Sequence, residues 1–356
     1  MSWIRNSLLL FGSTLIALAI AEILVFALYL TTPSILFPNH VNLNSLACKN
    51  ERCLAPRLHQ SLGWNTFRED PYGDGIRENV TYGSNEKFCV AAFGDSFTYS
   101  NDVKAADAWT SLLGEKLGCG VKNYGVGGYS VVQAIKKFEH YKPNEDLIIL
   151  LVYEEMLKRN LTASNFFIGG KDSGNIVLRP FIDRNRDLRE IPANVTSRAN
   201  IEEHIYADWF SKAPILDFPF LYNWAQFSLW KEKLPNHSEV YPSSRFSAWE
   251  SKDPDFWMIN TELLENSTSL FKGKKVVVAF LPSSTKLERS DKIEKLIESL
   301  DVPKNFCVLN PAKEIQISNP NNSNLLGKTN HFNELGERLL AESLYDGLVA
   351  CRKLWD

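Results

Sequence analysis

The feature that most constrains the fold of this chain is the run Leu-Ile-Ile-Leu-Leu-Val, which lies between Asp146 and Tyr153. A run that is apolar at every position is typical of a strand buried on both faces, and such strands belong to parallel sheets flanked by helices. We therefore expect a parallel sheet with helices packed against its faces.

Segments of the same two kinds alternate along much of the sequence. The expected strands are 87–93, 120–124, 146–153, 274–281 and 305–309, and the expected helices are 108–117, one capped by Ser130, 291–300 and 333–351. The helical segments carry apolar residues at three- and four-residue spacing, and Gly118 ends the first of them. This β-α-β-α-β order predicts an α/β protein with a mainly parallel sheet.

The first thirty residues differ in kind from the rest. Residues 7–30 are almost wholly apolar apart from Glu22, and as a helix of about 36 Å they would cross the hydrocarbon core of a membrane. Arg5 precedes the run and no Lys or Arg follows before Lys49, which predicts a cytoplasmic N-terminus and an extracytoplasmic main domain, periplasmic in a Gram-negative cell. A cleavable signal peptide is the alternative, because Ala19-Ile20-Ala21 resembles a cleavage site, although the apolar run continues beyond it.

The chain is expected to divide into three parts. Residues 1–31 form the anchor, residues 32–85 a linker and irregular lead-in rich in Pro, Asn, Gly and charge, and residues 86–356 the α/β domain. The alternation of strands and helices breaks at about 160–260, where a hairpin is expected at 176–191 and an aromatic stretch follows. We interpret this segment as an insertion that covers or extends the sheet edge, and it is equally suited to hold part of a substrate site.

Composition limits the partners of the chain. The net charge is −3 and no segment concentrates Lys and Arg, which argues against nucleic acid as a partner. No pair of cysteines has metal-site spacing with a histidine nearby, so neither a metal nor another cofactor is expected.

The six cysteines fit an exported domain. Cys48 and Cys53, which flank a short polar loop, are the best candidates for a disulfide. Cys89 lies in an expected core strand and is interpreted as a buried thiol. The remaining three cannot be paired from the sequence: Cys119, Cys307 and Cys351.

The sequence Gly-Asp-Ser, residues 94–96, directly follows the first expected strand. A buried strand that ends in this way presents a serine hydroxyl at the carboxyl edge of the sheet, where open α/β sheets bind their ligands. Gly94 lets the backbone turn sharply, and the residues after Ser96 can begin a helix whose N–H groups face an anion. Ser96 is therefore a candidate nucleophile, which needs a base and donors for an oxyanion.

Two further motifs supply candidates for these roles. His331 lies on a loop just before the last expected helix, where a functional side chain can project; the alternative is a histidine that only helps to cap that helix. A glycine-rich segment, residues 123–130, lies between a strand and a helix, and its backbone N–H groups can point at an oxyanion. The alternative for this segment is a plain glycine-rich turn.

Together the three motifs resemble the SGNH (GDSL-type) hydrolases. Gly-Asp-Ser-Phe-Thr follows one strand, Asn-x-Gly-x-x-Gly follows the next, and His-x-Asn-x-x-Gly precedes the last helix. Several motifs in one order are more specific than any of them alone. The order and spacing resemble the membrane-anchored branch found around bacterial cell-envelope polysaccharides, over about residues 60–160 and 270–350.

The resemblance implies a fold and a set of roles. The fold would be a flavodoxin-like, three-layer α/β/α sandwich, preceded here by one transmembrane helix. Ser96 would be the nucleophile and His331 the base, and the N–H groups of Ser96 and Gly128 would form part of the oxyanion hole.

Two positions depart from the pattern of the family. Where the family has an Asn that donates to the oxyanion, this chain has Glu154 or Glu155; an ionised carboxylate cannot donate, and losing one such donor typically costs about 100- to 1,000-fold in rate. Where the family has an Asp two or three residues before the base, this chain has Thr329 and Lys328. Orienting the base in this way is worth up to about 10⁴-fold in serine proteases.

Three functions remain open at this point, of which the least favoured is a structural envelope protein whose anchor is its main function. The first is a membrane-anchored esterase or O-acyltransferase that acts through Ser96 and His331 on acyl esters, acetyl above all, of an extracytoplasmic glycan. A backbone carbonyl or a distant acid would then hold the imidazole, and burial would protonate Glu154 or Glu155, or one of them would orient the base. The second is a catalytically degenerate SGNH-fold protein that binds a glycan or scaffolds an envelope assembly with biosynthetic partners.

Overall fold

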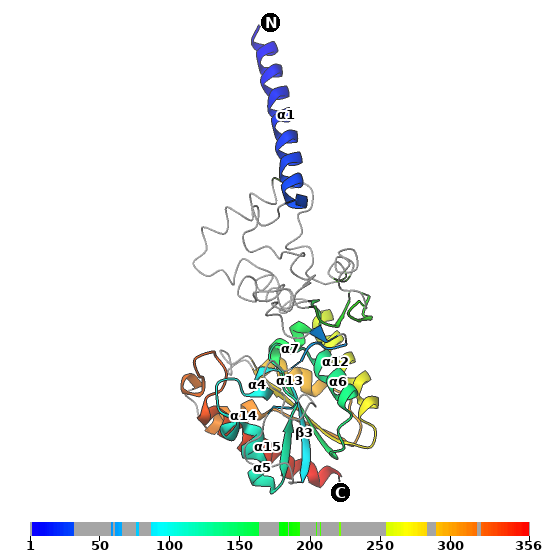
Figure 1. Ribbon diagram of the computed structural model, residues 1–356, viewed down its shortest axis with the longest axis vertical. Coiled ribbons are helices and arrows are strands. Elements are labelled where there is room, and N and C mark those ends of the chain that lie inside the picture. The colour runs from blue at the N-terminus through cyan, green and yellow to red at the C-terminus, as the bar shows by residue number, and fades with distance from the viewer. Residues whose placement is uncertain are drawn as a thin grey trace. The chain divides into compact units, whose positions relative to one another are not determined.

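The structure is a computed structural model, shown in Figure 1. It describes residues 2–31, 58–59, 61–65, 76–77, 87–163, 178–183, 185–192, 204, 207, 221, 254–282, 290–318 and 322–355. The chain forms two compact units, of which the first comprises Met1–Leu54, Thr162–Val177 and Pro192–Ser251, and the second Ala55–Leu161, Leu178–Ile191 and Lys252–Asp356.

The second unit is built on a five-stranded parallel sheet. Its strands are β3 (Phe88–Gly94), β4 (Gly120–Asn123), β5 (Leu147–Tyr153), β8 (Lys275–Leu281) and β9 (Phe306–Leu309), and their order across the sheet is β4-β3-β5-β8-β9. Strand β5 is buried at every position after Leu147, as its continuous apolar sequence predicts for a strand covered on both faces. The expected α/β fold with a mainly parallel sheet is therefore confirmed.

Helices cover both faces of this sheet (Figure 1). The first layer contains α5 (Trp109–Leu117), α14 (Pro311–Ser318) and α15 (Glu334–Trp355), and the second contains α6 (Val131–Tyr141), α12 (Pro254–Ser267) and α13 (Ser290–Ser299). The chain runs outward from β3 to β4 and then returns across β3 to β5. Because crossover connections between parallel strands are right-handed, this reversal puts α5 and α6 on opposite faces.

Local signals explain where the helices begin and end. The Ser130 hydroxyl accepts a hydrogen bond from the Gln133 N–H, and the Gln133 side chain accepts one from the Ser130 N–H, so α6 begins with the expected cap. Gly118, at φ 69°, ends α5 in the left-handed conformation. Helices α12 and α14 were not anticipated from the sequence, although each begins with a proline, a residue favoured at the first position of a helix.

Short elements complete the second unit. Two antiparallel pairs are β1 (Leu58–His59) with β2 (Gly63–Trp64) and β6 (Phe181–Ile182) with β7 (Leu188–Arg189). The second pair is the expected hairpin, and the Asp183 side chain closes its turn by accepting hydrogen bonds from two backbone N–H groups. The remaining short helices are α4 (Ser96–Tyr99), α7 (Glu154–Arg159), η1 (Ala105–Asp107), η4 (Thr268–Phe271) and η5 (Asn322–Leu325). The aromatic stretch of the predicted insertion lies outside the described residues, apart from isolated positions.

Two disulfides are present among the described cysteines. Cys89 pairs with Cys119 and Cys307 with Cys351, so the interpretation of Cys89 as a free thiol was wrong. The parallel pairing of β3 with β4 sets Phe88 opposite Gly120, and this register brings the neighbouring cysteines within a Cα–Cα distance of 5.9 Å. The proposed pair of Cys48 and Cys53 lies outside the described residues.

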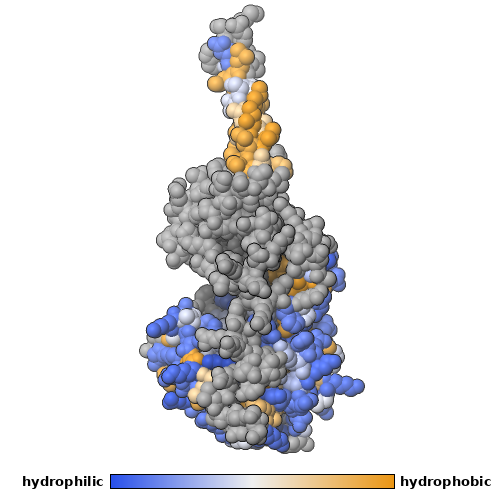
Figure 2. All heavy atoms as spheres, viewed as in Figure 1, coloured by the Kyte–Doolittle hydropathy of each residue, from blue (hydrophilic) through white to orange (hydrophobic). Residues whose placement is uncertain are grey.

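Helix α1 (Ser2–Thr31) belongs to the first unit. Its stretch Leu9–Leu28 is long and apolar enough to cross a membrane, and no other helix in the described part of the chain is. Most of its large apolar side chains are exposed, and Figure 2 shows hydrophobic residues along much of its length. By length and composition, this helix fits either a membrane anchor or a signal sequence.

Candidate active site

The carboxyl ends of β3, β4 and β5 meet at one edge of the sheet and carry the residues that the motifs predict. The chain reverses its direction across the sheet between β4 and β5, and open α/β sheets bind ligands at such a reversal, beyond the carboxyl ends of the strands. Ser96 follows β3 as the first residue of α4, and the glycine-rich segment follows β4. The fold therefore brings these two motifs together.

The turn that carries Ser96 is tightly constrained. A Cβ atom on Gly94 would lie 2.6 Å from the Leu151 carbonyl oxygen, so the close approach of β3 and β5 requires glycine there. The Asp95 side chain is wholly buried and caps α4 by accepting a hydrogen bond of 3.0 Å from the Phe97 N–H. Ser96 is itself buried, with 6% of its surface exposed. Its place is therefore set by the backbone and by the neighbouring acid.

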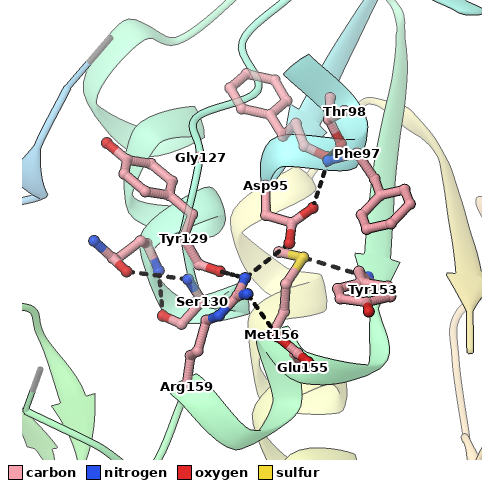
Figure 3. A network of polar contacts seen from close by, with 12 residues as sticks. Asp95, Phe97, Thr98, Gly127, Tyr129, Ser130, Tyr153, Glu155, Met156 and Arg159 are labelled. Carbon is pink, nitrogen blue, oxygen red and sulfur yellow. Dashed lines mark hydrogen bonds and ion pairs between the residues drawn. The ribbon is translucent and has the colours of Figure 1, made fainter. Parts of the chain in front are cut away.

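Arg159 joins this turn to the glycine-rich segment (Figure 3). Its Nη1 donates to Asp95 Oδ2 at 2.8 Å and to the Tyr129 carbonyl oxygen at 3.1 Å. Burial raises the pKa of Asp95 above its ordinary value, and the charge of Arg159 opposes that rise. Arg159 was not among the residues predicted from the sequence. Its only local signal is a basic residue four positions after Glu155, the spacing of a helical ion pair.

The glycine-rich segment packs directly against the Ser96 turn. A Cβ atom on Gly125 would lie 2.7 Å from the carbonyl carbon of Thr98, and one on Gly127 would lie 4.0 Å from Ser96 Cβ. Gly128 has a φ of 78°, which favours glycine. Neither the Ser96 N–H nor the Gly128 N–H donates a hydrogen bond to another described residue. Both are therefore free to donate to an oxyanion formed beside Ser96.

Three buried side chains hold the glycine-rich segment in place. Trp64 donates from Nε1 to the Gly127 carbonyl oxygen at 3.0 Å, and the Tyr129 hydroxyl donates back to the Trp64 carbonyl oxygen. Burial raises the pKa of Tyr129 well above its ordinary value, so this hydroxyl stays a donor. Asn123 accepts from the Gly125 N–H at 2.9 Å and donates to the Thr98 carbonyl oxygen at 2.7 Å. The segment thus enters the site as a fixed loop.

His331 lies on a tight loop that ends just before α15. Leu326 and Phe332 form an antiparallel bridge across this loop, and the Gly327 N–H donates to the His331 carbonyl oxygen at 2.7 Å. The imidazole lies 5.1 Å from the ring of Phe97, the residue after Ser96, measured between centroids. The two candidate residues are therefore at the same edge of the sheet. No hydrogen bond joins Ser96 Oγ to the imidazole or to any other described residue.

The His331 ring is bound through Thr329. The Thr329 hydroxyl lies 2.8 Å from His331 Nδ1 and also contacts Asp102 Oδ1, while the Thr329 N–H donates to Asp102 Oδ2 at 2.9 Å. Burial acts to raise the pKa of Asp102, but the hydrogen bonds from Thr329 and the charge of His331 together lower it below its ordinary value. Asp102 was not among the residues predicted from the sequence, and the only local hint of a role is its place soon after the helix that begins at Ser96.

A second buried acid fixes the segment between α4 and α5. Glu337 Oε2 accepts hydrogen bonds of 2.8 Å from the Ser100 hydroxyl and from the Trp109 N–H, which ties α15 to this segment. Burial raises the pKa of Glu337 to about 8, although both hydrogen bonds act to lower it. Arg77 donates to the carbonyl oxygens of Ser100 and Val103, at 3.0 and 2.8 Å. The segment that carries Asp102 is therefore held from two sides.

The two glutamates at the family's Asn position begin α7, directly after β5. Glu155 Oε2 accepts a hydrogen bond from Arg159 Nη2 at 3.0 Å, and its side chain is 40% exposed. It therefore serves as an acceptor in an ion pair, which is the opposite of a donor to an oxyanion. Glu154 is half-buried in the same first turn.

Comparison with family models and with curated proteins finds no match. Several solved structures are similar, among them two lipolytic proteins of the G-D-S-L family and an acetyl xylan esterase. The lipolytic protein from Veillonella parvula is 12% identical with a TM-score of 0.34, and the match covers 72% of this chain and 96% of that chain. The putative lipolytic protein from Desulfitobacterium hafniense is 15% identical with a TM-score of 0.32, and the match covers 72% of this chain and 98% of that chain. The acetyl xylan esterase from Butyrivibrio proteoclasticus is 11% identical with a TM-score of 0.33, and the match covers 79% of this chain and 68% of that chain. At these TM-scores the likeness adds no weight to what the residues themselves indicate.

The residues themselves place the motifs on the sheet as the resemblance implies. Ser96 follows β3, the glycine-rich segment follows β4, and His331 precedes α15, with a five-stranded parallel sheet between two helical layers. The chain therefore has an α/β fold with a parallel sheet, and its motifs lie where the resemblance to the SGNH (GDSL-type) hydrolases leads us to expect them.

Proposed function

We propose that this protein is a membrane-anchored serine esterase or O-acyltransferase that acts on acyl esters, acetyl esters above all, of an extracytoplasmic glycan. The observation that carries the proposal is the surroundings of Ser96. The serine lies against the glycine-rich segment, at the edge of the sheet that also carries His331, and the N–H groups of Ser96 and Gly128 donate no hydrogen bond to another described residue. A nucleophile, an oxyanion site and a base are the three parts that acyl transfer needs.

The first half of the reaction forms an acyl-enzyme. Ser96 Oγ attacks the carbonyl carbon of the ester, and His331 Nε2 takes the hydroxyl proton as the new C–O bond forms. The carbonyl oxygen becomes an oxyanion that accepts hydrogen bonds from the N–H groups of Ser96 and Gly128. When this intermediate collapses, the bond to the sugar oxygen breaks, and His331 returns the proton to the departing hydroxyl.

The second half of the reaction releases the acyl group. Water attacks the acyl-serine in an esterase, and a sugar hydroxyl attacks it in a transferase; in both cases His331 takes the proton from the attacking oxygen and then returns it to Ser96. The oxyanion site lacks the Asn that the family uses, since Glu155 is paired with Arg159. We therefore expect turnover about 100- to 1,000-fold below that of a site with all three donors.

The proposal also assigns a role to α1. A 20-residue apolar stretch, Leu9–Leu28, would hold the catalytic unit at the membrane surface, and Arg5 before it favours a cytoplasmic N-terminus. The substrate would then be a polymer of the cell envelope. Turnover of small soluble esters does not require this anchoring, so the two parts of the proposal can be tested separately.

The second candidate function is a degenerate SGNH-fold protein that binds a glycan or scaffolds an envelope assembly. Two observations favour it. Ser96 Oγ makes no hydrogen bond to His331 within the described structure, and an acceptor, Glu155, lies in the first turn of the helix where the family has an Asn donor. Catalytic hydrogen bonds are often long without substrate and tighten only in the complex, which is why we place this candidate second.

Hydrolysis of p-nitrophenyl acetate by the full chain in detergent tests the proposal. We expect release of p-nitrophenol by the wild type, its loss in Ser96→Ala and its retention in Ser343→Ala, a matched change on α15 away from the site. Mass spectrometry of a rapid quench should find the acetyl group on Ser96. Equal rates in the wild type and in Ser96→Ala would refute the enzyme and favour the glycan-binding protein. Adding an oligosaccharide and measuring its acetylation then separates transferase from esterase.

A further inference from the structure

We infer that Asp102 positions His331 for catalysis through the hydroxyl of Thr329, and so replaces the acid that the family carries beside its histidine. The inference rests on the proposed function of Ser96 and His331. Asp102 lies 227 positions before Thr329 in the sequence and on a different loop from the base, His331. Asp102 touches neither substrate nor reacting atoms in this scheme, so it is a positioning residue.

The hydrogen-bond donors in this cluster can be placed by elimination. An ionised carboxylate only accepts hydrogen bonds, so the proton of the Thr329 hydroxyl points to Asp102 Oδ1, and the Thr329 N–H donates to Oδ2. The Thr329 oxygen then has lone pairs left for His331 Nδ1, 2.8 Å away, and Nδ1 must carry the proton. The neutral ring therefore has its free lone pair on Nε2, as a base that accepts a proton from Ser96 requires.

The surrounding chain is shaped to keep Asp102 against Thr329. A Cβ atom on Gly327 would lie 2.9 Å from Asp102 Cβ and 3.0 Å from Asp102 Cγ. Because glycine has no Cβ atom, the loop can pack closely against Asp102. Arg77 fixes the backbone on both sides of Asp102 through the carbonyl oxygens of Ser100 and Val103. The Asp102 carboxylate is thus closely packed against the loop that carries Thr329 and His331.

A purely structural role is the competing explanation. In that case the contact would only fasten the loop of His331 to the segment after α4, and removing it would lower stability without changing the tautomer of the ring. The tautomer is therefore the measurement that separates the two explanations. It can be read from the ¹⁵N shifts and long-range proton couplings of the full chain in detergent, labelled at histidine, with the signal of His331 assigned by its loss in His331→Gln.

Four variants make the test specific. Asp102→Asn removes the charge, Thr329→Val removes the hydroxyl and keeps the shape, Thr329→Ser keeps the hydroxyl, and Asp107→Asn is a control acid in η1. We expect Nδ1–H in the wild type, in Thr329→Ser and in Asp107→Asn, and a shift toward Nε2–H in Asp102→Asn and Thr329→Val. The melting temperature of each variant reports any loss of the fold.

The same variants are then assayed with p-nitrophenyl acetate. We expect kcat/KM to fall about 10- to 1,000-fold in Asp102→Asn and in Thr329→Val. This loss is smaller than the roughly 10⁴-fold loss seen when an acid bonded directly to the histidine is removed, because here the Thr329 hydroxyl lies between the two. The double variant should lose no more than either single one, because both break the same link. Thr329→Ser should stay within about threefold of the wild type, since its hydroxyl still donates to the carboxylate.

The pH profile adds a readout that a structural role would not move. Removing the charge of Asp102 should change the acidic limb of kcat/KM, because Asp102 and His331 interact electrostatically. Glu337, whose pKa burial raises to about 8, also titrates near this segment, so each profile is repeated in a Glu337→Gln background. A shift that persists there belongs to Asp102.

The outcomes separate this inference from the proposed function. An Nε2–H ring in the wild type, a tautomer unchanged in Thr329→Val, or wild-type kcat/KM in both Asp102→Asn and Thr329→Val would overturn the positioning role and leave the esterase intact. If Ser96-dependent turnover is absent but the tautomer changes as expected, the enzyme fails and the positioning of His331 by Asp102 stands. Changes in both readouts, with Thr329→Ser close to the wild type, support the inference.

Discussion

Replacing the buried acid Glu337 with Gln should remove much of the pH dependence of folding. The carboxyl is buried on α15, and its Oε2 accepts two hydrogen bonds while its Oε1 has no partner among the described residues. Its pKa in the folded chain is about 8, against 4.5 ordinarily. At about 1.36 kcal/mol per pH unit, this difference corresponds to about 5 kcal/mol of folding free energy.

The sign of the effect follows from the raised pKa. The folded chain holds a proton on Glu337 that the unfolded chain has lost, so this stability is fully present below about pH 4.5 and is lost as the pH rises through about 8. A Gln side chain is neutral at every pH, and its oxygen can keep both hydrogen bonds to Ser100 and Trp109. We expect Glu337→Gln to be within about 1 kcal/mol of the wild type at pH 5 and several kcal/mol more stable at pH 8.5.

Denaturant unfolding of the full chain in detergent, followed by tryptophan fluorescence at pH 5 and pH 8.5, measures this difference. The control is Glu334→Gln, an exposed acid in the first turn of the same helix, which should change stability by less than about 1 kcal/mol at both pH values. A wild type with equal stability at the two pH values, or a Glu337→Gln variant less stable than the wild type at pH 8.5, would refute the reasoning.

Three other changes probe the network around the site. Arg159→Met should lower the free energy of unfolding by about 3–5 kcal/mol, because it leaves the Asp95 carboxyl buried without its ion pair; denaturant unfolding measures it, and a loss below about 1 kcal/mol would contradict it. Gly327→Ala should lower the kcat/KM for p-nitrophenyl acetate at least about tenfold with a small change in melting temperature, since the added methyl group pushes the His331 loop off the nearby acid; unchanged kinetics would show that this close approach is not needed. Replacing Cys89 and Cys119 with Ser should cost about 2–4 kcal/mol by opening a loop of 30 residues, and a non-reducing peptide map of the wild type should recover the two cysteines as one linked peptide.

Several features were predictable because their signals are local. The continuous apolar run of β5 by itself predicts a strand buried on both faces. Ser130 caps α6, the helix that begins at the next residue. The glycines near Ser96 mark places where the backbone must turn or approach another strand closely. The motifs that named Ser96 and His331 were read from short stretches of sequence, each beside its own strand or helix.

Other features were not predictable because they join residues that are remote in sequence. Cys89 was interpreted as a buried thiol because it lies in an apolar strand. The register of β3 with β4 places Cys119 beside it, and the two form a disulfide. Arg159 carries no local signal for the site beyond its spacing from Glu155, yet it binds the buried Asp95, 64 positions earlier. Such contacts depend on the order of the strands and on the closure of loops.

The sequence by itself determined the class of fold, the parallel sheet and the edge at which Ser96, the glycine-rich segment and His331 lie, because hydrophobic patterning and turn residues act over a few positions. Only the tertiary structure decided which groups surround them. The acid near His331 is Asp102, reached through Thr329 across 227 positions, and the buried acid that ties α15 to the same segment is Glu337. Both contacts require the segment after α4 to pack against residues near the other end of the domain, and no local pattern encodes that packing.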